Sequence, residues 1–103
     1  MNNARIVEVV LWNTTEGIAP EEAKTAAKTL NNFVQQQSGF VARKTAVAED
    51  GQFLDLVYWT DLASAKAASA KAMQATELRP IFGTMEQSTM FLKHFELFNQ
   101  LPQ

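Results

Sequence analysis

The sequence contains no cysteine, a single histidine, and few glycines and prolines. Its 103 residues include one His, four Gly and three Pro. Without cysteine, disulfides, thiolate metal sites and thiol catalysis are excluded. Four isolated glycines form no glycine-rich phosphate loop, and one histidine among scattered carboxylates has no metal-ligand spacing. We therefore expect neither a metal site nor a bound cofactor.

The sequence also lacks a basic block and a long hydrophobic run. The net charge is −2 and the pI is about 5.3, which argues against a nucleic-acid groove because such grooves need clustered Lys and Arg. The start of the sequence has no apolar run of signal-peptide length, and no apolar stretch approaches the length of a membrane span. With 47% apolar and 19% charged residues, the composition predicts one globular domain over residues 1–103, soluble and cytoplasmic.

Hydrophobic periodicity predicts a series of strands and helices. Alternating or β-branched residues indicate strands, and the stripe of Ala23, Ala27, Leu30 and Phe33 indicates a helix. The "EDG" at 49–51 is a hairpin turn signal. The predicted elements are a strand at 4–12, a helix at 20–37, strands at 40–48 and 52–59, a helix at 60–74 and an irregular connection at 77–86.

The final run, residues 88–98, fits a helix or a strand by periodicity alone. We favour a strand, because the element order then becomes βαββαβ, the ferredoxin-like α+β sandwich. That fold has an antiparallel sheet in the order 4-1-3-2 with both helices on one face. A helix in this place would leave the first strand without its outer neighbour.

Alternation divides the side chains of this sheet between two faces. We expect the helices to cover the face of Val7, Val9, Leu11, Leu54, Leu56 and Tyr58. The other face is too apolar to lie in water, so we expect a second copy of the chain to cover it. This second face carries Glu8, Val10, Trp12, Phe53, Asp55, Val57, Trp59, Met90, Leu92, His94 and Glu96.

The segment "GFVARKTAVAEDGQFLDLVYWTDLASAKAASA" (39–70) resembles the antibiotic-biosynthesis monooxygenase group of the dimeric α/β-barrel superfamily. The likeness consists of a hairpin opened by Gly-Phe, a strand ending in Tyr-Trp and a helix with a polar cap. The resemblance implies a two-fold dimer with a ligand cavity and, in some members, oxygenation of polycyclic phenols without a cofactor. Haem-degrading members use a His on the second helix, and residues 60–76 contain none, so haem is not expected.

His94, Glu8 and Glu96 are the candidate catalytic residues. A neutral imidazole can accept a phenolic proton, and a carboxylate can orient the ring. Glu8 lies in an apolar central strand, where a carboxylate needs a partner, and Arg43 or His94 can supply one. The structural alternative is an ion network, with His94 a satisfied interface residue, that holds the dimer in register. Both readings remain open.

The candidate ligand-binding residues form an apolar wall with a polar floor, as small-molecule sites commonly do. Trp12 and Trp59 are expected at the ends of adjacent parallel strands and therefore close together. The set is Trp12, Trp59, Phe53, Asp55, Arg43, Met90 and Leu92. We expect a monooxygenase-like protein for an aromatic or apolar substrate. The alternatives are a binding module for a fatty-acid-like ligand, with its head on Arg43 or His94, and a purely structural dimer.

Overall fold

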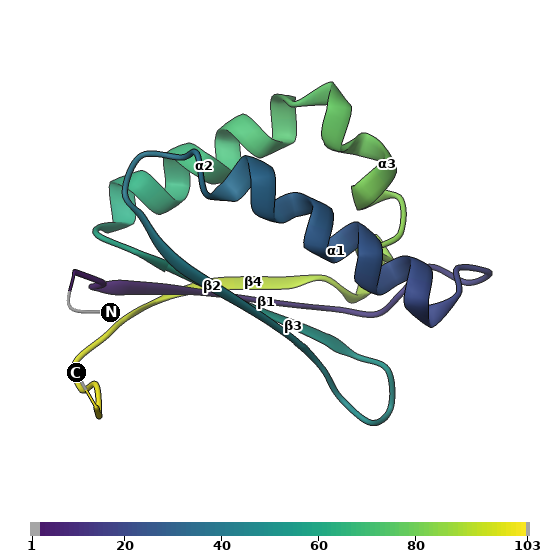
Figure 1. Cartoon of the computed structure of the whole chain (residues 1–103), viewed down its shortest axis with the longest axis horizontal. Helices are drawn as coiled ribbons and strands as arrows, with labels where there is room; N and C mark the ends of the chain where they lie inside the picture. Colours follow the sequence, from purple (N-terminus) through teal and green to yellow (C-terminus); the bar gives the residue numbers. More distant parts are fainter. Residues whose placement is uncertain (1–2, 103) are drawn as a thin grey trace.

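Two helices lie across one face of a four-stranded antiparallel sheet (Figure 1). The computed structural model describes residues 3–102. The strands are β1 (Ile6–Trp12), β2 (Phe40–Val47), β3 (Phe53–Trp59) and β4 (Phe91–Glu96), in the sheet order β2-β3-β1-β4. This is the predicted order 4-1-3-2 read from the other edge. The ferredoxin-like architecture, including a strand for the final run, is therefore confirmed.

The helices form close to where the sequence places them. Helix α1 (Pro20–Val34) begins with Pro20 in its first turn, where the missing N–H is not needed, and ends three residues before the predicted boundary. Helix α2 (Leu62–Gln74) is capped by Asp61, whose Oδ1 accepts the Ser64 backbone N–H at 2.7 Å. This hydrogen bond lowers the pKa of Asp61. No helix within residues 3–102 combines the length and apolarity needed to cross a bilayer.

The segment after α2 is more regular than predicted. It contains η1 (Thr76–Leu78), α3 (Arg79–Phe82) and η2 (Gln87–Thr89). Backbone hydrogen bonds fasten it to the end of β1: Thr15 N–H donates to the Thr84 carbonyl at 2.9 Å, and Glu86 N–H to the Asn13 carbonyl at 2.8 Å. Met85 and Met90 are thereby brought beside the helix-covered face of the sheet.

Gly39 is required where α1 passes into β2. Its φ is +83°, and an added Cβ would lie 2.4 Å from Ser64 Oγ on α2. Any other L-residue would meet both backbone strain and a collision with α2. This close approach lets the start of α2 pack beside the start of β2, and it fixes the position of the Ala-rich helix over the sheet.

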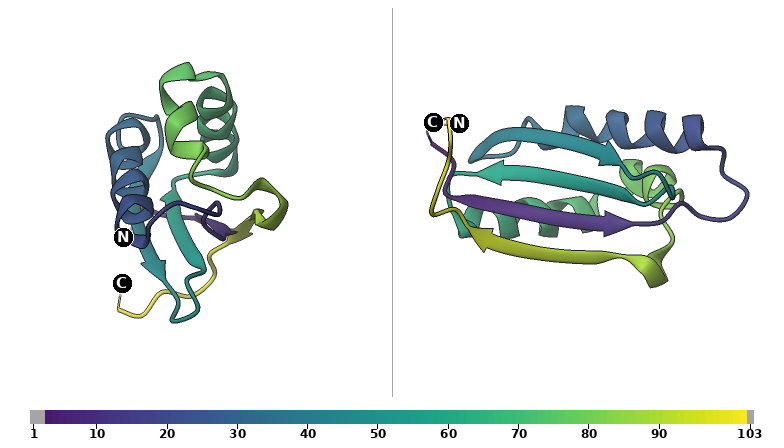
Figure 2. Two further views of the ribbon diagram at one scale, coloured as in Figure 1. Left: turned by 90° about the vertical axis from the view of Figure 1, so that its right-hand side faces the viewer. Right: turned by 90° about the horizontal axis from the view of Figure 1, so that it is seen from below.

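The assignment of the two sheet faces was wrong. The helices cover the face of Glu8, Trp12, Asp55 and Trp59, and these four residues are buried within the chain itself. The face of Val7, Val9, Leu11, Leu54, Leu56 and Tyr58 is the open one, seen in the right-hand view of Figure 2. No second copy is therefore needed to cover the mixed apolar and charged face. The alternation of side chains along a strand assigns residues to two faces, but it does not indicate which face the helices cover.

The predicted closeness of Trp12 and Trp59 was also wrong. Strands β1 and β3 are antiparallel, so Trp12 pairs with Phe53 and Trp59 pairs with Ile6, at opposite ends of the two strands. Trp12 stacks on Phe53 with ring centroids 5.3 Å apart, and Trp59 meets Phe40 edge-on at 6.1 Å. The two indoles mark the two ends of the helix-covered face.

Candidate functional site

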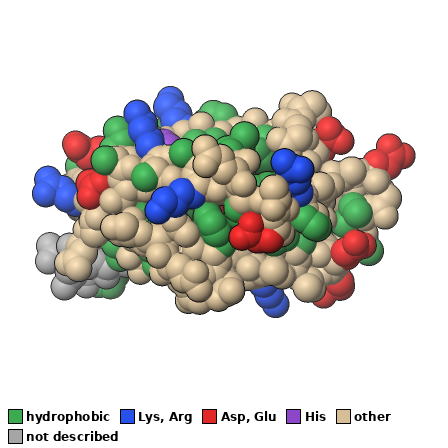
Figure 3. All heavy atoms as spheres, turned by 90° about the horizontal axis from the view of Figure 1, so that it is seen from above, with side chains coloured by type: hydrophobic (Ala, Val, Ile, Leu, Met, Phe, Trp, Pro, Cys, Tyr) green, Lys and Arg blue, Asp and Glu red, His purple; other side chains and the backbone are tan. Residues whose placement is uncertain are grey.

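A cavity of about 350 Å³ lies between the sheet and the two helices. Its volume is in the range of small-molecule sites. Figure 3 shows the helix-bearing side, where hydrophobic side chains reach the surface between charged ones. The cavity is lined by Glu8, Val10, Trp12, Leu30, Phe33, Val34, Gln37, Asp55, Val57, Trp59, Ala68, Ser69, Ala72, Met73, Phe82, Met85, Gln87, Met90 and Leu92.

Small side chains on α2 create this space. Ala65 and Ala68 are buried and let the helix lie close to the sheet. Farther along, Ser69 and Ala72 face the cavity and do not fill it. Met73 is 83% exposed and Leu92 is 47% exposed, so these lining residues mark the rim of the opening.

Five of the predicted ligand-binding residues line the cavity: Trp12, Trp59, Asp55, Met90 and Leu92. Phe53 does not, because it is buried beneath Trp12 in the hydrophobic core. Sequence reasoning missed the helical part of the lining. Leu30 and Phe33 belong to the stripe that predicts the apolar face of a helix, and Val34, Met73 and Met85 also line the cavity. Periodicity marks such residues as inward-facing, but it cannot show that space remains beside them.

Glu8 and His94 form a pair at one side of the cavity. The two residues are register partners on β1 and β4, and His94 Nε2 lies 2.9 Å from Glu8 Oε1. Their side chains are only 11% and 16% exposed. Of the two partners predicted for Glu8, His94 is therefore the one present. Glu8 lines the cavity, whereas His94 lies behind it and lines a separate surface groove.

Burial raises the pKa of Glu8 above the ordinary value of 4.5. Hydrogen bonding and charge from His94 oppose this rise, the Asp55 carboxylate adds to it, and a hydrogen bond from Ser69 opposes it. Burial outweighs the rest. Glu8 is thus a carboxyl group that holds its proton more strongly than usual and, when ionised, is a stronger base than an exposed carboxylate.

Glu96 does not take part in this pair. It is exposed at the end of β4 and lies opposite Ile6, one step along the face from His94. It lines the same surface groove as His94, but the imidazole Nε2 is bonded to Glu8. Glu8, and not Glu96, is therefore the carboxylate that orients the ring.

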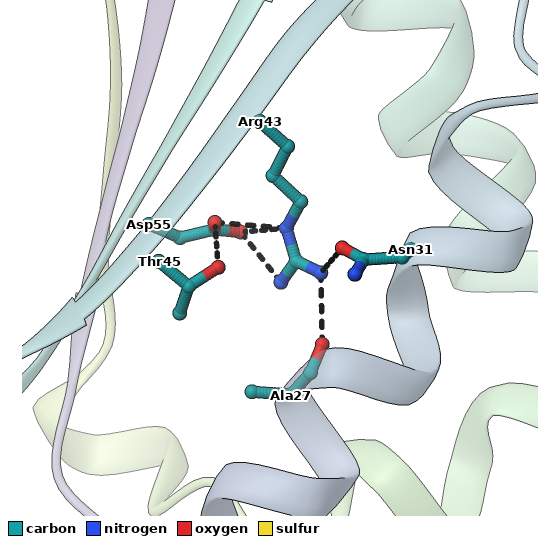
Figure 4. Close-up of polar contacts among 5 residues, drawn as sticks. All are labelled: Ala27, Asn31, Arg43, Thr45 and Asp55. Carbon is teal, nitrogen blue, oxygen red and sulfur yellow. Dashed lines mark hydrogen bonds and ion pairs between the residues drawn. The ribbon is translucent and has the colours of Figure 1, made fainter.

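Arg43 is bound to Asp55 and is absent from the cavity lining (Figure 4). Its Nε donates to Asp55 Oδ1 at 2.9 Å and its Nη2 to Oδ2 at 3.0 Å. Its Nη1 donates to the Ala27 carbonyl and to Asn31 Oδ1 on α1, both at 2.8 Å. Thr45 Oγ1 also donates to Asp55. We therefore correct the expected role of Arg43: its donors hold α1 on the sheet and do not face a ligand.

Among residues 3–102, no group of three or more His, Asp or Glu side chains is arranged to hold a metal ion. The chemistry that the site offers comes from its side chains: one carboxyl group with a raised pKa, one imidazole behind it, and aromatic and aliphatic walls. This arrangement can accept a proton from, or donate one to, an apolar ligand that carries a hydroxyl group.

Removing one member of the Arg43–Asp55 pair should destabilise the fold strongly. The side chains are 4% and 10% exposed, and an unpaired buried charge costs about 3–5 kcal/mol. We expect Arg43→Met to lower the free energy of unfolding by that amount, measured by urea denaturation. The double variant Arg43→Met/Asp55→Leu should recover part of the loss, because no charge is then left alone. A double variant less stable than Arg43→Met would contradict the ion-pair argument.

The raised pKa of Glu8 predicts how stability depends on pH. The folded chain holds the Glu8 proton to higher pH than the unfolded chain, so the stabilising effect is full below about 4.5 and is lost as pH rises through the folded pKa. Denaturation at a series of pH values should therefore show that, as pH rises, the unfolding free energy of the unmodified protein falls relative to that of Glu8→Gln. Glu96→Gln, at an exposed position, is the control. Parallel pH courses for the unmodified protein and Glu8→Gln would refute the burial argument.

The fold is shared with solved oxygenases over nearly the whole chain. No protein-family model matches the sequence, and no curated protein matches it. SnoaB, a cofactor-independent oxygenase from Streptomyces nogalater, is 23% identical with a TM-score of 0.68, covering 97% of this chain and 100% of SnoaB. The monooxygenase ActVA-Orf6 of Streptomyces coelicolor, solved in complex with nanaomycin D, is 11% identical with a TM-score of 0.73, covering 100% and 96%.

A conserved protein of unknown function from Bacteroides thetaiotaomicron, described as a possible oxidoreductase, also matches. It is 25% identical with a TM-score of 0.70, covering 92% of this chain and 99% of the other. Together these structures confirm the resemblance inferred from residues 39–70 at the level of the fold. The chain has a ferredoxin-like fold, which it shares with these oxygenases.

Proposed function

We propose that this protein is a cofactor-independent monooxygenase for an aromatic substrate that carries a hydroxyl group. The observation that carries the proposal is Glu8: a buried carboxyl group with a raised pKa, facing an apolar cavity and bonded to His94 at 2.9 Å. The fold shared with SnoaB, which is a cofactor-independent oxygenase, supports it. ActVA-Orf6 was solved with a small-molecule ligand, nanaomycin D, which agrees with a ligand-binding cavity here.

The assignment of the base changes from the one expected from sequence. We expected His94 to deprotonate the substrate with the help of a carboxylate. Since Glu8 lines the cavity and His94 does not, Glu8 is the group that touches the substrate, and His94 supports it. Trp12 and Trp59 on the sheet, with Phe33 and Phe82 opposite, give aromatic walls against which a flat ring can pack.

The proposed reaction begins when Glu8 takes the proton of a phenolic hydroxyl. Negative charge then spreads onto a ring carbon, which reduces O₂ and forms a carbon–oxygen bond to it. The oxygen–oxygen bond breaks as water leaves. That water carries the proton held by Glu8 and the hydrogen of the attacked carbon, and the product is a quinone. The substrate supplies the electrons, and O₂ is the oxidant.

A non-catalytic binding module is the second candidate function. The same cavity would hold a neutral apolar ligand. A fatty-acid-like ligand is a poorer fit than expected, because the charged lining residues are Glu8 and Asp55 and Arg43 is bonded to Asp55 and α1. The open cavity also argues against a purely structural dimer with a filled core.

Oxygen uptake with 1,8-dihydroxyanthrone, a tricyclic phenol, tests the proposal. We expect uptake above the spontaneous rate, with one atom of ¹⁸O₂ in the new carbonyl group. Glu8→Gln should lower the rate by about 100-fold or more while binding of 2-naphthol persists. Ala72→Trp, which fills the cavity, should abolish binding and uptake, whereas Ala70→Trp, on the exposed side of the same helix, should not.

Equal rates for Glu8→Gln and the unmodified protein would refute the catalytic role of Glu8. If 2-naphthol binds and no variant or condition gives uptake above the spontaneous rate, the binding-module function is the correct one. Circular dichroism spectra of all variants establish that each has folded.

We also propose that a second copy of the chain covers the open face of the sheet. This face carries Val9, Leu56 and Tyr58, and β4 adds Phe91 and Phe95, which are 45% and 42% exposed. Its two lysines, Lys44 and Lys93, lie on the outer strands as register partners of Leu56 and Val9, so the centre of the face is apolar. An apolar surface of this kind on a sheet indicates an interface, and a two-fold axis lets the same surface serve both partners. The homodimer expected from the sequence is thus retained, but through the opposite face.

Sedimentation equilibrium tests this interface. We expect a dimer for the unmodified protein and a monomer for Leu56→Lys, because a charge at the centre of the open face would be buried without a partner. Leu62→Lys is the matched control: Leu62 is an exposed apolar residue on α2, on the opposite side of the molecule, and its replacement should leave the dimer intact. A monomeric unmodified protein would refute the proposal.

A further inference from the structure

Two separate openings reach the two members of the Glu8–His94 pair. Glu8 lines the cavity between the sheet and the helices. His94 lines a surface groove beside β4, which we call the β4 groove, formed by Arg5, Ile6, Thr60, Asp61, Leu62, His94, Phe95 and Glu96. Glu8 is absent from the groove lining and His94 from the cavity lining. The hydrogen bond between Nε2 and Oε1 is the connection between the two spaces.

We propose that Glu8 exchanges its proton with solvent through His94 and the β4 groove, and not through the mouth of the cavity. This proposal rests on the proposed function, because it concerns the same carboxyl group. It assigns His94 as a positioning and relay residue, not as a residue that touches the substrate. Glu8 could then still exchange its proton with solvent while a ligand fills the cavity and excludes water from the carboxyl group.

The geometry suits a relay. Nε2 of His94 is engaged with Glu8, and no hydrogen-bond partner for Nδ1 occurs among residues 3–102. Since imidazole carries a proton at either nitrogen, one nitrogen can serve Glu8 while the other serves water in the groove. His94→Gln would keep a hydrogen bond to Glu8 but could not pass a proton to water in the groove.

The charged groups around the pair come from several elements. Glu8 faces His94 on β4, Asp55 on β3 and Ser69 on α2, and Asp55 is neutralised by Arg43 on β2. The cavity-lining residues of α1, Leu30, Phe33 and Val34, and Gln37 just after this helix carry no charge. His94 shares the groove with Asp61, Glu96 and Arg5.

The step balances without any further reactant. It begins from a Glu8 carboxylic acid and a neutral His94 that carries its proton on Nδ1. The Glu8 Oε1–H bond breaks and its proton bonds to His94 Nε2, while Nδ1 gives its proton to water in the groove. The pair ends as a carboxylate beside a neutral imidazole. One proton has left Glu8, one has entered the groove, and no electron has moved.

A pH jump with 2-naphthol bound tests the relay without turnover. Excited 2-naphthol gives its proton to a neighbouring carboxylate and then emits as naphtholate, so its emission reports the charge on Glu8. With the ligand saturating, we expect the emission of the unmodified protein to follow the jump within the mixing time. In His94→Gln the change should be at least tenfold slower and no faster than 2-naphthol dissociation, measured separately by dilution.

Chemical rescue provides the second measurement. In His94→Ala, added imidazole should restore the fast response without weakening 2-naphthol binding, because it enters through the β4 groove. Glu96→Gln, which changes the groove but not the pair, should respond like the unmodified protein. Circular dichroism verifies the fold of each variant.

Each other outcome has a definite meaning. A response in His94→Gln as fast as in the unmodified protein would overturn the relay and leave Glu8 as the base. Competition between imidazole and 2-naphthol would also overturn it, since the two openings would then be one space. Bound 2-naphthol without naphtholate emission would overturn the proposed function and the relay together. A fast, His94-dependent response without oxygen uptake from the anthrone would overturn the oxygenase alone.

Discussion

The bidentate ion pair between Arg43 and Asp55 is the constraint on which the cavity depends. Burying two charges is costly unless their geometry and remaining hydrogen bonds are satisfied, and here the guanidinium also donates to Ala27 and Asn31 on α1. The pair therefore fixes the distance between α1 and the sheet. With α2 set close to the sheet by its alanines and by Gly39, the two helices are held apart at the place where the cavity lies.

This arrangement explains why two carboxyl groups on one face of the sheet behave differently. Asp55 has a permanent cation beside it and serves the structure. Glu8 is paired with His94, whose imidazole carries no permanent charge. This pairing does not offset the cost of burying the carboxylate, so the pKa of Glu8 is raised. An acid whose charge is left partly uncompensated in an apolar space is a base available for chemistry. In the proposed mechanism, the fold thus separates a structural carboxylate, Asp55, from the proposed base, Glu8, on neighbouring strands.

The sequence was enough to predict the first five elements and the hairpin, because these depend on local periodicity and turn residues. The strand nature of residues 91–96 followed from the order of those elements, since periodicity alone also allowed a helix there. The sequence also predicted the pairing of Glu8 with His94 as one of two options. It failed on which face the helices cover, because both faces of β1 and β3 are rich in apolar residues. The role of Arg43 was wrong because alternation can give the face of the sheet on which its side chain lies, but not the partners that it meets there. Those partners are Asp55 and the acceptors on α1.

The reversed faces also change where function can reside. If the mixed apolar and charged face were a dimer seam, Glu8 and His94 would lie between two copies, and assembly would govern their chemistry. Because the chain's own helices cover that face, one copy contains the whole cavity, and the open face remains available for assembly. The small residues of α2 then have a second consequence. They bring the helix close enough to bury Glu8, yet leave space beside it, so that the same feature raises the pKa of the carboxyl group and admits the ligand on which it would act.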